Sequence, residues 1–207
     1  TLIWSGSAWG NEPAASHGTL AGTAGQNDLF DHAYETASGV RVSAEATLVL
    51  RVDEERLRPA SFRLAARTGD RETACDLTFD GGRARGTLRR GGKEIAVDRK
   101  LPDGVVVLDE TVLHYYRTLY RRYDFAGGGA QTAPVYFPSA DTVLEAKLER
   151  GEPVRVRRDG KTETLERVTA AFGDLSVDLF GTREGRLFVL SCPDRMLTAG
   201  MPGYGDA

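Results

Sequence analysis

The sequence predicts a mainly β protein: an antiparallel meander that forms a curved sheet or half-barrel packed on a single α-helix over about 109–124. Two observations indicate the meander. Short runs alternate between apolar and polar residues, as strands with one buried face do. Turn-forming glycine steps, which supply the positive φ angles of tight hairpins, separate these runs. They lie at 68–70, 80–82, 91–92, 159–160 and 184–185. The third observation is one segment with helical spacing.

Alternation is clearest early in the chain. Val42, Ala44, Ala46, Leu48 and Leu50 form an apolar stripe with mostly polar residues between them, which predicts a long half-buried strand. The runs at 83–90 and 93–99 are more polar and flank Gly91-Gly92. They predict a weakly buried hairpin near a sheet edge, where charge discourages unwanted pairing. Later strands are expected at 135–137, 142–148, 154–158, 161–169, 175–180 and 186–190.

The segment 109–124 breaks this rhythm. Asp109 is a suitable N-cap, and Gly127-Gly128-Gly129 can end a helix in a left-handed conformation. Between them, apolar and aromatic residues recur at three- and four-residue spacing, which predicts one buried helix face. That face contains Val112, Tyr115, Tyr116, Leu119 and Tyr123.

The chain of 207 residues has no linker that would separate two domains, and a β domain of this length is common. We therefore expect one β-rich domain over 28–207, preceded by a glycine-rich arm over 1–27. The arm carries the only tryptophans, Trp4 and Trp9. Because disordered segments are poor in aromatic residues, the arm is expected to dock on its own domain or on a neighbouring subunit.

Composition excludes several classes of partner. The net charge is −3 with both signs interspersed, so no overall field favours nucleic acid or an anionic membrane. No stretch approaches the roughly 20 apolar residues of a transmembrane helix. The chain starts at Thr1 rather than methionine, and a cleaved signal peptide or a trimmed sequence explains this start.

The two cysteines have two interpretations. Cys75 and Cys192 each share a predicted strand face with apolar residues, so they can be separate buried thiols. Alternatively, they form a long-range disulfide, which would suit an oxidising compartment. No histidine lies near either cysteine at ligand spacing, so a metal site is not expected.

No catalytic or cofactor signature is present. The sequence lacks a Gly-x-Ser-x-Gly elbow, a Walker loop and a His-Glu-x-x-His helix, so we expect no catalytic residue, cofactor or metal. The histidines His17, His32 and His114 have no metal-binding spacing. Carboxylates near the last hairpin and the helix start can serve glycoside hydrolysis if two converge, although each also suits a turn, a cap or a soluble face. They are Asp103, Asp109, Glu110, Asp174, Asp178 and Glu184.

A resemblance rests on three segments, 108–123, 134–138 and 185–193. Their order, a meander followed by a helix after Leu108-Asp109 and a last strand that ends at Pro193, resembles that of uncharacterised bacterial envelope proteins over residues 40–195. A half-barrel on one helix is also similar to periplasmic lipoprotein carriers. The resemblance implies a periplasmic or extracellular location after signal-peptide removal, and an apolar ligand. It transfers no binding residue.

The predicted function is a non-enzymatic envelope protein with a binding or structural role. An apolar or lipid-like ligand would contact Tyr115, Tyr116, Leu119 and Tyr123. One alternative is a subunit of a larger assembly that joins its neighbours through residues 1–27 and its sheet edges. The other is a carboxylate-dependent hydrolase.

Overall fold

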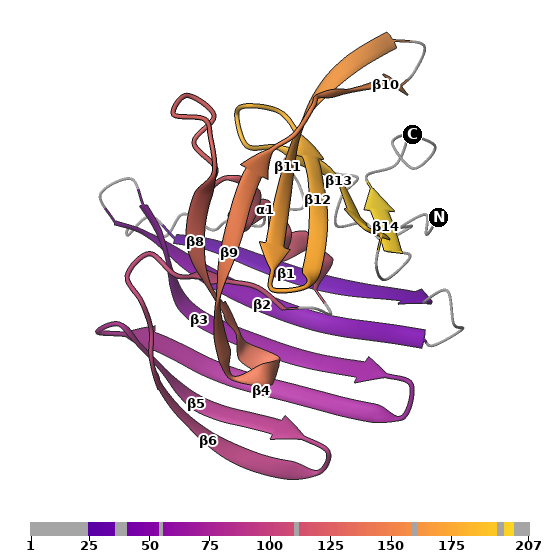
Figure 1. Ribbon diagram of the computed structural model, residues 1–207. Coiled ribbons are helices and arrows are strands. Elements are labelled where there is room, and N and C mark those ends of the chain that lie inside the picture. The colour runs from indigo at the N-terminus through magenta and orange to yellow at the C-terminus, as the bar shows by residue number, and fades with distance from the viewer. Residues whose placement is uncertain are drawn as a thin grey trace. The chain divides into compact units, whose positions relative to one another are not determined.

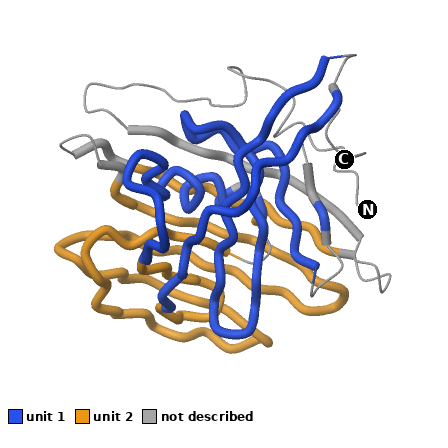
Figure 2. The backbone as a smooth tube through the Cα atoms, turned by 45° about the horizontal axis from the view of Figure 1, so that its top comes forward, with its two compact units in different colours: residues 1–5, 113–133, 144–207 blue, residues 6–112, 134–143 orange. Residues whose placement is uncertain are grey.

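The computed structural model describes residues 25–35, 41–53, 56–109, 112–158, 161–193 and 197–200. Strands dominate these residues, as predicted, and the fold class is confirmed (Figure 1). The chain forms two compact units, each built from separate segments (Figure 2). Among the described residues, unit 1 contains those in 113–133 and 144–200, and unit 2 those in 25–112 and 134–143. Residues 1–24 of the predicted arm lie outside the described residues. The predicted boundary at residue 28, between the arm and a single domain, stays a prediction.

Unit 2 contains a six-stranded antiparallel meander in sequence order, in which each strand pairs with the next (Figure 1). Alternate residues are buried over 42–50, 60–66 and 75–79, and the stripe from Val42 to Leu50 is confirmed. Tight turns with left-handed glycines join the later strands, at Gly69, Gly81-Gly82 and Gly91-Gly92. The strands are β1 (Gly25–Glu35), β2 (Arg41–Asp53), β3 (Arg56–Thr68), β4 (Arg71–Asp80), β5 (Arg83–Arg90) and β6 (Lys93–Lys100).

One glycine accounts for the close approach of β4 and β5. Leu48, Phe62 and Leu77 lie in one cross-strand row with Gly86, and all three are fully buried. Gly86 has a φ of 149°, and a Cβ there would overlap the backbone carbonyl of Asp76. A glycine at such a point lets a strand bend sharply and another backbone approach closely. The β5–β6 hairpin can therefore curl as part of the half-barrel.

Other segments of unit 2 pack on this sheet. Strand β7 (Val106–Val107) pairs in parallel with β8 (Gln131–Phe137), and the 3₁₀ helix η2 (Pro138–Ala140) follows. The ring of Tyr136 meets that of Phe79 edge-on, with centroids 6.3 Å apart. Elements β7 and η2 contact β3, β4 and β5, so they cover part of the apolar face.

Unit 1 contains a second antiparallel sheet in the order β14-β13-β12-β11-β9, with β10 paired to β11. The chain passes between the units within β8 and β9. A bulge at Phe180/Gly181 bends β12 where it pairs with β13. The strands are β9 (Thr142–Arg150), β10 (Val154–Arg158), β11 (Lys161–Phe172), β12 (Leu175–Gly181), β13 (Leu187–Cys192) and β14 (Leu197–Gly200).

The predicted helix is present but much shorter than 109–124. A 3₁₀ turn η1 (Leu113–Tyr115) leads into α1 (Tyr116–Tyr120), the only α-helix among the described residues. Asp109 is not its N-cap, because it forms an isolated bridge with Val112, and the N-cap residue is Tyr115. Hydrogen-bonded turns continue to Tyr123 and maintain the helical spacing of the aromatic residues. A helix this short is unstable alone and depends on its packing. No described helix is long and apolar enough to cross a membrane.

Candidate functional site

The four residues predicted to contact an apolar ligand are all buried in unit 1: Tyr115, Tyr116, Leu119 and Tyr123. Tyr116 meets Phe172 edge-on at 6.4 Å, and Tyr123 meets Phe125 at 5.0 Å between ring centroids. The hydroxyl of Tyr123 donates to the carbonyl of Gly129 at 2.9 Å. The predicted buried face is therefore brought together, and these contacts fill it with protein. The ligand-binding role stays a prediction.

Tyr120 belongs to the same cluster, although the sequence did not single it out. It is fully buried, and its hydroxyl donates to the backbone carbonyl of Glu166 at 3.4 Å. A Cβ on Gly181 would lie 2.9 Å from its ring, so the glycine at the β12 bulge makes room for it. Burial, and then the charge of Glu166, raises the pKa of Tyr120 far above its ordinary value. Tyr120 is thus a neutral donor and not an acid–base group at neutral pH.

Glu166 is the buried centre of an ionic cluster in unit 1. It is 7% exposed, and its two carboxylate oxygens contact different arginines. Arg150 Nη2 lies 2.7 Å from Oε2, and Arg183 Nε lies 2.6 Å from Oε1. Burial alone would raise the pKa of Glu166, but hydrogen bonds from Arg183 and Arg150 outweigh it and hold the pKa below its ordinary value. The cluster joins β9, β11 and the loop before β13.

Asp178, one of the candidate hydrolase carboxylates, is also paired. Arg167 binds its carboxylate in a bidentate manner, with Nε–Oδ1 and Nη2–Oδ2 distances of 3.1 Å and 3.0 Å. The Thr169 hydroxyl donates to Oδ1 at 2.7 Å. Hydrogen bonds from the Thr182 side chain and its own backbone amide lower the pKa of the exposed Glu184. These contacts occupy the carboxylate oxygens of Asp178 and favour the ionised form of Glu184.

The remaining candidate carboxylates have different surroundings. Asp103 is exposed and lies 3.9 Å from Arg58, Asp174 is exposed, and Asp109 is fully buried in unit 2. Glu110 lies outside the described residues. An acid–base role for these carboxylates therefore stays a prediction.

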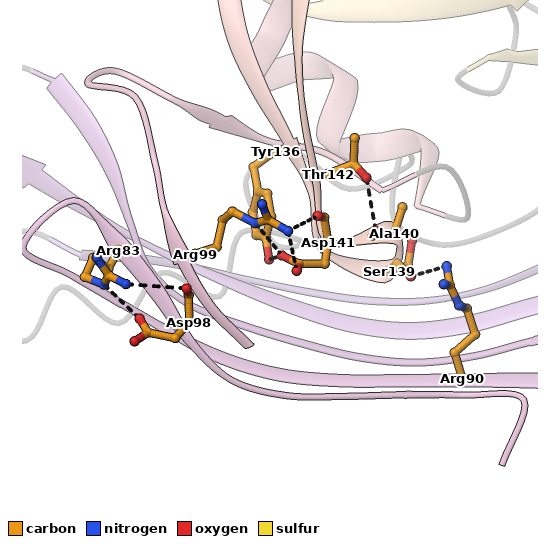
Figure 3. A network of polar contacts seen from close by, with 9 residues as sticks. All are labelled: Arg83, Arg90, Asp98, Arg99, Tyr136, Ser139, Ala140, Asp141 and Thr142. Atoms are coloured by element: carbon orange, nitrogen blue, oxygen red, sulfur yellow. Dashed lines mark hydrogen bonds and ion pairs between the residues drawn. The ribbon is translucent and has the colours of Figure 1, made fainter. Parts of the chain in front are cut away.

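A second ionic network, in unit 2, was not predicted (Figure 3). Arg99 of β6 binds the carboxylate of Asp141 with Nη2–Oδ2 and Nε–Oδ1 distances of 2.7 Å and 3.1 Å. The buried Tyr136 hydroxyl donates to the same carboxylate at 3.0 Å. The arginine lowers the pKa of Asp141, whereas burial and the carboxylate raise that of Tyr136. This network fastens the edge strand β6 to the residue that follows η2.

Both cysteines are buried and free, so the interpretation as separate thiols agrees with the structure and the disulfide is not formed. Burial, and then the nearby charge of Asp109, raises the pKa of Cys75 to about 12. A thiol with so high a pKa stays protonated and is a poor nucleophile.

An open groove of about 400 Å³ lies on the outward face of β2–β5 in unit 2. Its floor contains Ala65 and Ala74, which share one cross-strand row with Glu45 and Arg89. The groove forms because the short side chains of Ala65 and Ala74 lie between the longer charged side chains of Glu45 and Arg89. Because each charged residue there is also typical of a solvated sheet face, the groove alone indicates no ligand.

The described residues contain no group of three histidine, cysteine or acidic side chains that can hold a metal ion. Trp4, Trp9 and His17 lie outside the described residues, and the side chains of His32 and His114 are not described. The predicted arm contacts therefore stay predictions.

Residues 22–175 match the protein family described as "Protein of unknown function (DUF3108)". This chain belongs to the DUF3108 family. The match extends from just before β1 to the first residue of β12, so it covers all described strands of unit 2. It agrees with the expected likeness to uncharacterised β-rich proteins.

No curated protein matches the DUF3108 chain significantly. Among solved structures it is similar to a beta-barrel-like protein of the domain of unknown function DUF1849 from Brucella abortus. That likeness has a TM-score of 0.47 and 16% identity, over 80% of this chain and 81% of the other.

Proposed function

We propose that this DUF3108 chain is a non-enzymatic binding or structural module of the bacterial cell envelope. What supports a periplasmic or extracellular location is the resemblance of residues 40–195 to envelope proteins. A half-barrel meander also suits a module that presents surfaces and does not enclose a reaction.

The observation that carries the non-enzymatic part is that three buried or half-buried carboxylates, Glu166, Asp141 and Asp178, are bound by arginines. Glu166 is bound by two arginines, and Asp141 and Asp178 are each bound by one bidentate fork. General acid catalysis at neutral pH needs a carboxyl pKa raised towards 7. The shifts of Glu166 and Asp141 go in the opposite direction. These groups support the fold and are poor candidates for proton transfer.

The apolar inward face of β2–β5 supports a lipid-like ligand. Small residues such as Ala44, Ala46 and Ala66 lie there beside Leu64 and Phe62, so the surface is uneven and apolar. Within unit 1, a separate aromatic cluster contains Tyr115, Tyr116, Leu119 and Tyr123. All of these side chains are buried, so a ligand could bind only by displacing packed side chains. A purely structural role requires no such displacement.

Two measurements test this proposal. The first is fractionation of source cells that produce the protein with its natural upstream sequence, and we expect it in the periplasm or the medium. Recovery only in the cytosol would overturn the location. The second is native mass spectrometry of the protein from that fraction. A stoichiometric apolar adduct supports the binding version, and its absence leaves the structural version alone.

The alternative of an assembly subunit rests on the edge of β6, which among the described strands pairs only with β5. Lys93, Arg99 and Lys100 on this strand would repel the same strand of a second copy. Self-association through the predicted arm over 1–27 avoids that repulsion. Sedimentation velocity over a range of concentrations, with and without residues 1–16, tests it, and a strictly monomeric full chain would refute it.

A further inference from the structure

The β5–β6 hairpin concentrates positive charge that the composition of the chain conceals. From Arg83 to Lys100 it carries seven arginines and lysines against two carboxylates, a net charge of +5. The whole chain carries −3, so the remaining residues carry −8. Only Ala84, Leu88 and Val97 of the two strands are buried, which confirms the weakly buried hairpin that the sequence predicted.

Cations face each other across this hairpin at both ends. Arg90 is directly opposite Lys93, and Arg83 is directly opposite Lys100. Like charges in directly opposed positions destabilise a sheet. The arrangement has a stability cost in the isolated protein, and a negatively charged partner would remove that cost.

Most of the other cations have acidic partners. Asp98 binds Arg83 and Arg85, Glu94 binds Arg89, and Asp141 binds Arg99. Within the part of the chain that the structure describes, Arg90 makes only a 3.4 Å hydrogen bond to the carbonyl of Ser139 (Figure 3). No acidic partner of Lys93 occurs there either. Charge at the turn Gly91-Gly92 is therefore available to an outside anion.

An exposed apolar side chain accompanies these two cations. Ile95 is 40% exposed, one of two large hydrophobic side chains that are exposed in the described residues. It is opposite the buried Leu88, two residues along each strand from the Arg90–Lys93 pair, so all three project from the same face of the hairpin. We call Arg90, Lys93 and Ile95 the hairpin tip.

We propose that the hairpin tip binds the surface of an anionic phospholipid bilayer. Two cations can contact lipid phosphates while Ile95 enters the boundary with the acyl chains, the combination by which peripheral proteins bind membranes. Nucleic acid is the less suitable polyanion, because the hairpin from Arg83 to Lys100 has no aromatic residue on which bases can stack. The biological setting rests on the proposed envelope location, but vesicle binding can be measured without it.

Flotation of the full chain with lipid vesicles tests the proposal. We expect binding to vesicles that contain about one-third phosphatidylglycerol and none to pure phosphatidylcholine, with loss of binding at about 0.5 M salt. The R90Q/K93Q variant is expected to bind roughly 25-fold more weakly, since each basic residue at an anionic surface contributes about a factor of five. I95S is expected to bind about three- to tenfold more weakly, from lost apolar burial.

The matched control is R155Q/R157Q, which removes two exposed arginines from β10. We expect it to bind within about twofold of wild type, apart from the small long-range effect of net charge. Absence of wild-type binding to anionic vesicles, or equal loss in both double variants, would overturn the proposal. Tighter binding to a DNA oligonucleotide than to vesicles would also overturn it, and an I95S variant that binds like wild type would overturn its apolar part. A cytosolic location with intact vesicle binding would refute only the proposed function.

Discussion

Arg99 and Asp141 are 42 residues apart in sequence, yet their side chains form a two-pronged ion pair with a shortest distance of 2.7 Å. Asp141 has a left-handed backbone with a φ of 46°, the only positive value among the described residues other than glycine. Aspartate tolerates this conformation better than most residues do. The bidentate ion pair and the left-handed backbone of Asp141 together fix the edge strand β6 to the segment after η2.

Asp141→Asn should therefore destabilise the protein. Asparagine keeps the size and the left-handed tolerance, but it removes the charge that Arg99 and Tyr136 contact. We expect a loss of about 1.5–3 kcal/mol in the free energy of unfolding, measured by urea titration. The control is Asp76→Asn, because Asp76 forms an exposed pair with Arg63 at 3.2 Å. That change should cost less than about 1 kcal/mol. Equal costs for the two variants would refute the importance of the Arg99–Asp141 pair.

Gly86→Ala should be more harmful than an alanine at the neighbouring turn. The added methyl group would overlap the Asp76 carbonyl in a backbone conformation that side chains rarely adopt. Gly91 also has a left-handed φ of 57°, but nothing lies within 4 Å of its Cβ position. We expect Gly91→Ala to cost about 1 kcal/mol and Gly86→Ala more than about 3 kcal/mol, in thermal or urea unfolding. A Gly86→Ala protein as stable as Gly91→Ala would show that β4 and β5 can separate at little cost.

Local patterns predicted the hairpins well. The expected strands at 83–90 and 93–99 agree with β5 and β6 almost to the residue, because the glycine turn and the alternation of side chains are both encoded locally. The apolar stripe from Val42 to Leu50 was confirmed for the same reason.

Contacts between distant residues could not be predicted from such patterns. The spacing of Tyr116, Leu119 and Tyr123 is compatible both with a long helix and with a short helix followed by turns. The predicted helix length was therefore wrong. The pairing of Arg99 with Asp141 depends on where η2 lies against the sheet. The net charge of −3 likewise did not indicate the positive hairpin, because a net charge does not say where along the chain the charges lie.

Cys75 and Cys192 should react slowly with alkylating reagents in the folded protein. Both are buried, and the pKa of Cys75 is raised to about 12, so little thiolate is available at pH 8. We expect no iodoacetamide adduct on the native protein within minutes and two adducts in about 6 M guanidinium without a reductant. Mass spectrometry distinguishes the outcomes. A denatured protein that gains adducts only after reduction would contain the disulfide, in contradiction to the structure.

Glu166→Gln should change how stability depends on pH. The folded-state pKa of Glu166 is lowered below its ordinary value of about 4.5, so the unfolded chain takes up the proton first as pH falls. The carboxylate therefore contributes stability that is complete above the unfolded pKa and is lost as pH decreases through the lower folded pKa. Urea titrations should find Glu166→Gln less stable than wild type by about 2–4 kcal/mol at pH 7, since Arg150 and Arg183 lose their shared charge.

Below pH 4.5 that difference should shrink, because wild type loses the ionised carboxylate and the variant has none to lose. Arg183→Gln serves as the matched control: it removes one of the two arginines and should give a smaller loss at pH 7, since the Arg183 side chain is 62% exposed. A constant difference between wild type and Glu166→Gln from pH 7 down to about pH 3 would mean that Glu166 does not titrate below its ordinary range, and the two arginines would then stabilise the fold by packing and not by charge.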